Sequence, residues 1–120
     1  MLAHQTGRAG EFFAAYHLQI AGADVYHVNA SVDLIVMSAS GRLLAVEVKA
    51  ASKGRGIKRQ SYAFKIKRQR PDFYVFVALD LGRLAVMGSS EVHKRGTMRL
   101  YSDAFSQEAM QSGIARIIDA

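Results

Sequence analysis

Two short apolar runs joined by a Ser/Gly segment carry three charged side chains into what should be a sheet interior. The first run, Leu-Ile-Val-Met, follows Asp33, and the second, Leu-Leu-Ala-Val-Glu-Val-Lys, ends at Glu47 and Lys49. Apolar, partly β-branched runs on either side of a turn at 38–41 predict a β-hairpin. Burying charged side chains costs free energy, and a protein keeps them buried where they serve a function. This span therefore constrains both the fold and the function of the chain.

Alternation of side chains along a strand sorts these charges onto one face. Glu47 and Lys49 are two residues apart and therefore point the same way. Pairing around the turn brings Asp33, at the start of the first strand, beside the end of the second. We therefore expect Asp33, Glu47 and Lys49 to converge at one end of the sheet. Paired carboxylates, with the backbone carbonyl of Val48 as a further oxygen, suit Mg²⁺ or Mn²⁺ and predict a site for cutting a phosphodiester bond.

Lys49 has a separate role in this interpretation. Its ammonium would orient or deprotonate an attacking water, or stabilise the negative charge that develops on phosphorus. The plainer alternative is an ion pair with Glu47, worth less than about 1 kcal/mol when exposed. The apolar context of the strand favours the catalytic interpretation.

A helix is predicted over residues 7–21, capped by Thr6 and ended by Gly22. Within it, Glu11 shares a face with the small and apolar residues that follow at helical spacing, among them Leu18. Glu11 is thus a candidate third carboxylate for the site. The alternative is an acid in the first helical turn that interacts favourably with the helix dipole.

The rest of the chain reads as a mixed α/β domain with one central sheet, and residues 1–120 are expected to form one domain. The span 73–79 is apolar throughout and predicts a strand buried on both faces. Ser102 and Asp103 are candidate caps of a final helix that runs through Gln111 and is broken at Gly113. Further strands are predicted at 24–28, 61–67, 83–87 and 97–101, and a short helix at 89–94.

Basic residues gather in one part of the chain. The net charge is +6, and eight of the sixteen basic residues lie between positions 53 and 70 with no acid among them. A clustered positive charge of this kind is a footprint of nucleic-acid binding, although a solubilising surface is the alternative. The candidate DNA-binding residues are Lys53, Arg55, Lys58, Arg59, Lys65, Lys67, Arg68 and Arg70.

The remaining composition narrows the possibilities. The chain has no cysteine, which excludes disulfides and cysteine-bound zinc. It has no apolar stretch of membrane-spanning length and no signal-peptide pattern at its beginning, so a cytoplasmic protein with no membrane partner is expected. Its four histidines are scattered, and no phosphate-binding glycine loop is present, so neither a histidine-metal site nor nucleotide hydrolysis is indicated.

Three segments together resemble the PD-(D/E)xK nuclease superfamily. They are the helical stretch Gly-Arg-Ala-Gly-Glu-Phe-Phe-Ala-Ala at 7–15, Val-Asp-Leu-Ile at 32–35 and Val-Glu-Val-Lys at 46–49. The resemblance implies a restriction-endonuclease-like core with a central mixed β-sheet flanked by helices. It also implies that Asp33 and Glu47 bind Mg²⁺, that Lys49 is catalytic, and that Glu11 joins the site as it does in a subset of members. Val32 stands where many members have proline.

In size and layout the chain is most similar to the small Holliday junction resolvases of archaeal and phage type. That likeness implies a homodimer, encoded by a phage or a prokaryotic host, that cuts four-way or other branched DNA in recombination and repair. A site-specific homing or restriction-type endonuclease is the first alternative, and a non-catalytic nucleic-acid-binding module is the second. Ser31 and Gln60 are auxiliary candidates, with an ordinary turn residue and an ordinary loop residue as their respective alternatives.

Overall fold

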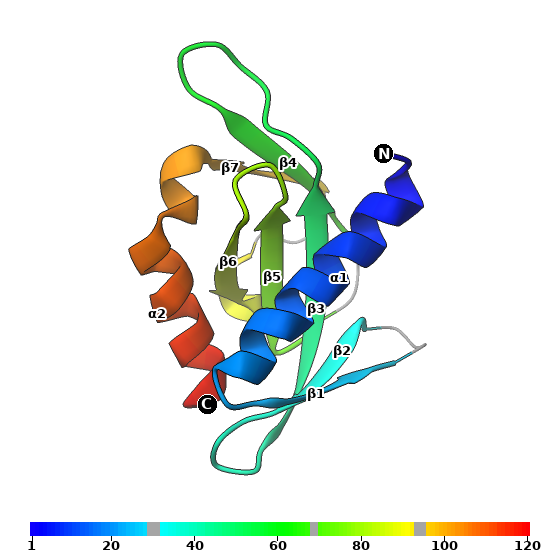
Figure 1. The fold of residues 1–120 in the computed structure, drawn as a ribbon, viewed down its shortest axis with the longest axis vertical. Helices are drawn as coiled ribbons and strands as arrows, with labels where there is room; N and C mark the ends of the chain where they lie inside the picture. Colours follow the sequence, from blue (N-terminus) through cyan, green and yellow to red (C-terminus); the bar gives the residue numbers. More distant parts are fainter. Residues whose placement is uncertain (29–31, 68–69, 93–95) are drawn as a thin grey trace.

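A computed structural model describes residues 1–28, 32–67, 70–92 and 96–120, so two of the candidate residues, Ser31 and Arg68, lie outside the described part (Figure 1). In chain order the elements are α1 (Ala3–Ile20), β1 (Asp24–His27), β2 (Leu34–Met37), β3 (Leu43–Ala51), β4 (Ser61–Ile66), β5 (Phe73–Ala78), β6 (Arg83–Gly88), the 3₁₀ turn η1 (Ser89–Glu91), β7 (Gly96–Tyr101), the 3₁₀ turn η2 (Ser102–Phe105) and α2 (Gln107–Ile118). None of the helices in these ranges is long and apolar enough to cross a membrane.

The central sheet is mixed, as expected. Its strand order is β1-β2-β3-β5-β6, with β3 and β5 parallel and the other neighbours antiparallel. The apolar strand β5 lies between β3 and β6 and is buried on both faces, which confirms the interpretation of residues 73–79. The prediction of one sheet was incomplete, because β4 and β7 pair with each other in a second, two-stranded sheet.

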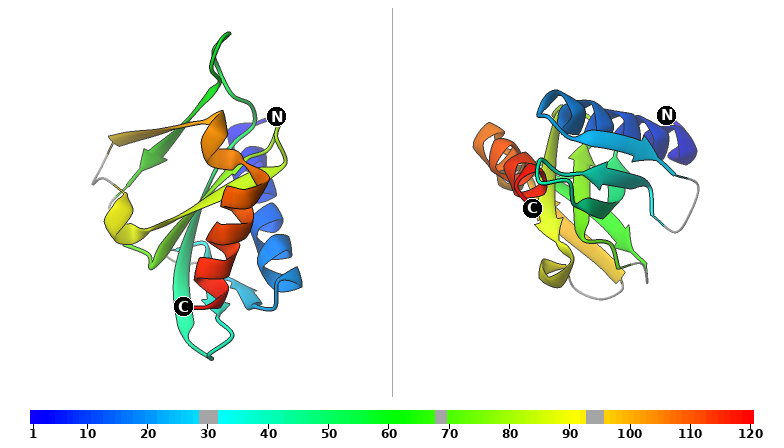
Figure 2. Two further views of the ribbon diagram at one scale, coloured as in Figure 1. Left: turned by 90° about the vertical axis from the view of Figure 1, so that its left-hand side faces the viewer. Right: turned by 90° about the horizontal axis from the view of Figure 1, so that it is seen from below.

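The two faces of the central sheet have different covers (Figure 2). Residues of α1 and α2, such as Leu18 and Ile117, pack in one apolar cluster with Val46 and Val75 of the sheet. The opposite face packs against the small sheet and η2 in a second cluster that is rich in aromatic residues. Both helices therefore lie on the same side, and the small sheet takes the other.

Helix α1 begins at Ala3, four residues before the predicted start, so the assignment of Thr6 as its cap was wrong. The side chain of Gln5 accepts a hydrogen bond from the Leu2 N–H at 2.9 Å, and this satisfies a free donor at the helix end. The hydroxyl of Thr6 instead donates to the carbonyl of Leu2 at 3.2 Å. With this start Glu11 lies in the middle of the helix, where the dipole interpretation no longer applies.

The final helix also differs from the prediction. It begins after Ser106, whose hydroxyl accepts a hydrogen bond from the Ala109 N–H at 3.1 Å, while Ser102 and Asp103 belong to η2. Gly113 does not break the helix. A Cβ at this glycine would lie 2.8 Å from the Cβ of Val86, so the missing side chain lets α2 pack closely on β6.

Helix α1 lies equally close to β3. A Cβ at Gly10 would meet the Cβ of Ala50 at 2.4 Å, and neither atom can move away by changing rotamer. The neighbouring Glu11 is thereby held at the level of the last residues of β3. The glycine before Glu11 thus sets how near the helix carboxylate comes to the charged end of that strand.

Replacing Gly10 by alanine is expected to destabilise the protein by up to about 2 kcal/mol. Overpacking against Ala50 costs about 1–3 kcal/mol, and the better helix propensity of alanine returns up to about 1 kcal/mol. Gly7→Ala is the matched control, since nothing lies within 4 Å of its added Cβ, and it should stabilise α1. Thermal unfolding of both variants tests this, and equal melting temperatures would contradict the close approach of α1 to β3.

Candidate active site

The hairpin of β2 and β3 sets Asp33 opposite Glu47. Leu34 pairs with Val46, and Asp33 is the next residue outward, so the same register places it across from Glu47. The Asp33 carboxylate accepts a hydrogen bond from the Val48 N–H at 2.8 Å. The convergence expected from the sequence is therefore confirmed in geometry, and Asp33 is held to the middle of β3 by its own side chain.

Glu47 is a buried acid with an unusual surrounding. Glu47 is only 5% exposed, and its Oε2 lies 3.5 Å from the Nζ of Lys49. Its other oxygen, Oε1, is buried and has no hydrogen-bond partner among the described residues. A buried carboxylate oxygen without a donor costs free energy, which is expected where a group is kept for chemistry.

The protonation of Glu47 reflects this surrounding. Burial raises the pKa of Glu47 to about 7, aided by the negative charge of Asp33 and by a hydrogen bond with Asp33, while Lys49 acts in the opposite direction. Glu47 therefore keeps its proton to a higher pH than an exposed glutamate does.

Glu11 approaches Asp33 from α1. Burial and the charge of Asp33 raise the pKa of Glu11, while His27 and Arg8 lower it. Of the four residues proposed from the sequence as catalytic, the structure brings Asp33, Glu47 and Lys49 together where β2 begins beside β3, and Glu11 comes near Asp33 from the helix side.

Sequence reasoning missed Tyr74 and Arg8 as neighbours of the site. Tyr74 of β5 pairs with Glu47 in the parallel register and is buried beside it. Burial and then Glu47 raise the pKa of Tyr74, and Arg70 lowers it. Arg8 could have been found, because it lies one helical turn before Glu11. Tyr74 carried no local signal, since its place depends on the pairing of β3 with β5, which are distant in sequence.

The donor set fits a hard divalent cation. Asp33 and Glu47 offer carboxylate oxygens, and the unpartnered Oε1 of Glu47 is the kind of oxygen that a metal ion satisfies. The N–H and C=O of one strand residue point to the same edge, so the Val48 carbonyl faces the side of Asp33, beyond the end of β2. Among the described residues no three acidic or histidine side chains form a ready cluster of ligands.

The basic residues proposed for DNA binding are exposed wherever the structure describes them. Lys53, Arg55, Lys58 and Arg59 lie in the loop between β3 and β4, and Lys65 lies on β4. Lys67 and Arg70 are exposed as well, on the stretch that leads from β4 to β5. Of the auxiliary candidates, Gln60 ends the loop, where its carbonyl accepts a hydrogen bond from the Ser102 N–H and its side chain lies 3.4 Å from the Tyr62 hydroxyl, away from Glu47.

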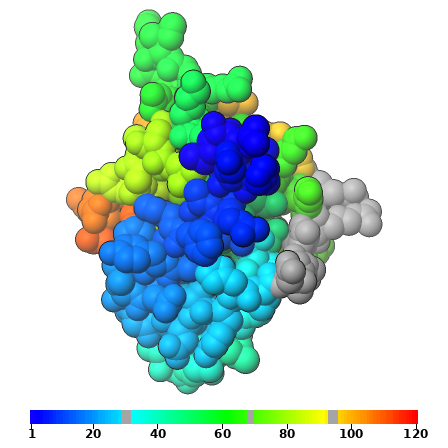
Figure 3. Space-filling view, turned by 45° about the vertical axis from the view of Figure 1, so that its right-hand side comes forward, coloured from blue at the N-terminus to red at the C-terminus, as the bar shows by residue number. Residues whose placement is uncertain are grey.

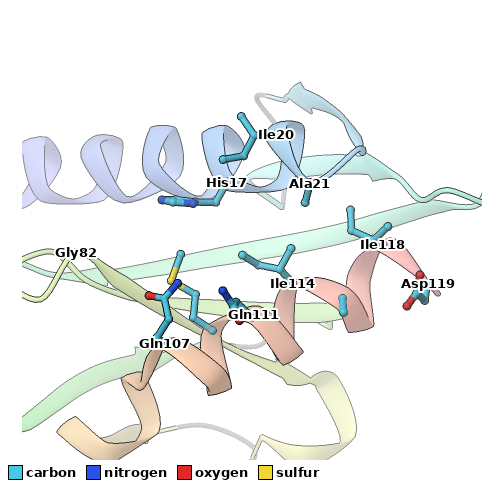
Figure 4. A pocket seen from close by; sticks show the side chains of 11 residues that line it. His17, Ile20, Ala21, Gly82, Gln107, Gln111, Ile114, Ile118 and Asp119 are labelled. Atoms are coloured by element: carbon cyan, nitrogen blue, oxygen red, sulfur yellow. The ribbon is translucent and has the colours of Figure 1, made fainter.

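A pocket of about 600 Å³ opens elsewhere, between the second half of α1 and α2 (Figure 4). Apolar side chains such as Ile20, Ile114 and Ile118 line it together with His17, whose pKa is lowered by burial. None of the four acidic and basic residues of the site lines it. The candidate site around Glu47 and this pocket are therefore separate features of the molecule.

The mixed sheet, with helices on one face and a charged end at β3, matches an endonuclease fold. The chain is similar to the structure of a bacterial homing endonuclease, I-Ssp6803I, with a TM-score of 0.70 over 99% of both chains at 18% sequence identity. No protein-family model matches the chain, and no curated protein matches it. At this identity the likeness establishes the fold.

Proposed function

We propose that this protein is a metal-dependent DNA endonuclease that hydrolyses phosphodiester bonds at the site around Glu47. The observation that supports it most is the buried, unpartnered Oε1 of Glu47 beside a second acid and a lysine. A fold shared with a homing endonuclease over the whole chain adds to this, as does the exposed basic stretch. A module that only binds DNA would have no need for a costly buried acid.

Asp33, Glu47 and the Val48 carbonyl are the proposed ligands of Mg²⁺, for which Mn²⁺ should substitute. When bound, the ion would supply Lewis-acid stabilisation of the phosphate and lower the pKa of water. The chain's own part is to hold Asp33 in place through the Val48 N–H, and to place the Lys49 ammonium 3.5 Å from Glu47. From there Lys49 can stabilise the negative charge that develops on phosphorus as water attacks.

Two DNA substrates are compatible with this chemistry. A duplex of defined sequence is favoured by the fold shared with a homing endonuclease. Branched DNA, cut by a homodimer in the manner of a Holliday junction resolvase, is favoured by the small chain and by the order of Glu11, Asp33, Glu47 and Lys49. In a homodimer two sites at a fixed separation would give paired cuts.

Cleavage of a panel of labelled DNAs distinguishes these possibilities. The protein would be incubated with Mg²⁺ and a four-way junction, linear duplexes of varied sequence and single strands, with Asp33→Ala as the comparison. We expect cleavage that the Asp33→Ala protein loses. Cutting confined to junctions supports the resolvase function, and cutting of one duplex sequence supports the homing function. Binding without cleavage in either Mg²⁺ or Mn²⁺ would exclude the enzyme.

A further inference from the structure

The loop of residues 52–60, between β3 and β4, projects from one end of the molecule and is here called the arm (Figures 1 and 3). Ile57 near its tip is fully exposed, with a relative exposure of 102%. A single exposed apolar residue is ordinary on a protein surface. Ile57 differs in its surroundings, because the arm carries four basic residues, Lys53, Arg55, Lys58 and Arg59, and no acid.

The arm is tied at its base by hydrogen bonds. The backbones of Arg55 and Ser61 exchange two N–H···O bonds, of 2.9 and 2.8 Å, so a single antiparallel bridge closes the base of the arm. The Gly54 N–H and the Tyr62 hydroxyl both donate to the carboxylate of Asp80, at 3.0 and 2.9 Å. Burial, with the hydrogen bond to Asp80, raises the pKa of Tyr62 to about 12, so the hydroxyl keeps its proton at neutral pH.

The tip and the returning strand are also defined. Gly56 has φ of +112°, a conformation that favours glycine, and the chain reverses there. On the way back, the Arg59 guanidinium lies 3.7 Å from the centre of the Tyr101 ring and 3.6 Å from the Asp103 carboxylate. Arg59 therefore helps to fix the arm to β7 and η2, and leaves Lys53, Arg55 and Lys58 to face a partner.

The position and charge of the arm indicate a polyanion next to the active site. The arm leaves β3 three residues after Lys49, about 10 Å further along the strand, which is well within one turn of a DNA helix. Basic side chains on both sides of the arm suit the two phosphate walls of a groove. An isoleucine between them gains nothing from phosphates, but it gains from apolar contact with bases.

We propose that the arm enters the major groove of the bound DNA duplex, where Ile57 packs against base edges while Lys53, Arg55 and Lys58 contact phosphates. The major groove is about 12 Å wide and can admit a loop that projects and returns, whereas the minor groove is only about 6 Å wide. Ile57 is then the residue of the arm that senses sequence, through contacts such as the thymine methyl group. This proposal rests on the endonuclease function proposed above.

The test compares Ile57→Ala with the wild type on duplexes about three helical turns long, selected by the wild type from a randomised pool with Ca²⁺ replacing Mg²⁺. Ile57→Ala should bind about tenfold more weakly, or about 1.4 kcal/mol, with an unchanged dependence of affinity on salt. Lys58→Ala should instead reduce the salt slope by about 0.9. Dimethyl sulfate should show protection of guanine N7, in the major groove, that Ile57→Ala loses.

Leu43→Ala is the matched control, because Leu43 is 60% exposed and lies by the β2–β3 turn at the opposite end of the molecule (Figure 1). Its affinity and protection pattern should equal those of the wild type. If Ile57→Ala also equals the wild type, or if protection falls on adenine N3 in the minor groove, the arm proposal is wrong while the endonuclease proposal stands. A wild type that retains no duplex would overturn the arm proposal, and the endonuclease proposal would then be decided by the cleavage of junctions.

Discussion

Glu47→Gln is expected to lower the rate of metal-dependent DNA cleavage by at least about 100-fold while DNA binding persists. Glutamine keeps the size of the side chain but removes the charge that a divalent cation and Lys49 both use. The basic residues that would contact phosphates are exposed elsewhere and are untouched by the change. Single-turnover cleavage and binding measured on the same DNA separate the two effects.

Glu108→Gln is the matched control for this substitution. Glu108 is an exposed acid in the first turn of α2, outside the group formed by Asp33, Glu47 and Lys49. Cleavage by Glu108→Gln should stay within about twofold of the wild type, as expected for a surface change. If Glu47→Gln cleaved DNA as fast as this control, the site would have to be placed elsewhere.

The same Glu47→Gln substitution is expected to stabilise the metal-free protein at alkaline pH. The folded protein holds the pKa of Glu47 at about 7, above its ordinary value of 4.5, because the side chain is buried and lies beside Asp33. Between these values the folded state binds more protons than the unfolded state, so the free energy of unfolding falls as pH rises. The shift corresponds to roughly 3 kcal/mol of stability, present below pH 4.5 and lost above about pH 7.

Thermal unfolding in a metal chelator between about pH 5 and about pH 8 measures this loss, which corresponds to roughly 10 °C in melting temperature. Glu11, whose pKa is also raised, contributes with the same sign. Glu47→Gln should flatten most of the slope, whereas Glu108→Gln should keep it. Mg²⁺ should stabilise the wild type more at the higher pH, because ionised ligands bind it best. A wild type equally stable at both ends of this range would contradict a raised pKa of Glu47 in the folded protein.

The meeting of the candidate site residues was predictable because its signals are local. The turn at 38–41 and the two-residue alternation fix the register of β2 against β3, and with it the meeting of Asp33 and Glu47. Tyr74 could not be placed in the same way. It reaches Glu47 through a parallel pairing of β3 with β5, which depends on a long connection rather than on neighbouring residues.

The helix ends were less predictable, for a different reason. Several residues compete for each cap, and the sequence does not rank them. Ser102, Asp103 and Ser106 all suit the start of a helix, but residues 102–105 form η2, whose Phe105 is buried in the aromatic cluster, and α2 begins only after Ser106. Tertiary packing therefore decided between local signals of similar strength.

The alternation of β3 has a consequence for how this protein tolerates change. Val46 and Val48 pack under the helices, while Glu47 and Lys49 form the site on the other face. Neighbouring positions of β3 thus have different roles: one packs in the core and stabilises the fold, and the next takes part in the proposed cleavage chemistry. Substitutions along β3 should alternate between those that lower the amount of folded protein and those that leave an abundant but inactive one. Along β3, a constraint from stability and a separate constraint from activity therefore alternate from one residue to the next.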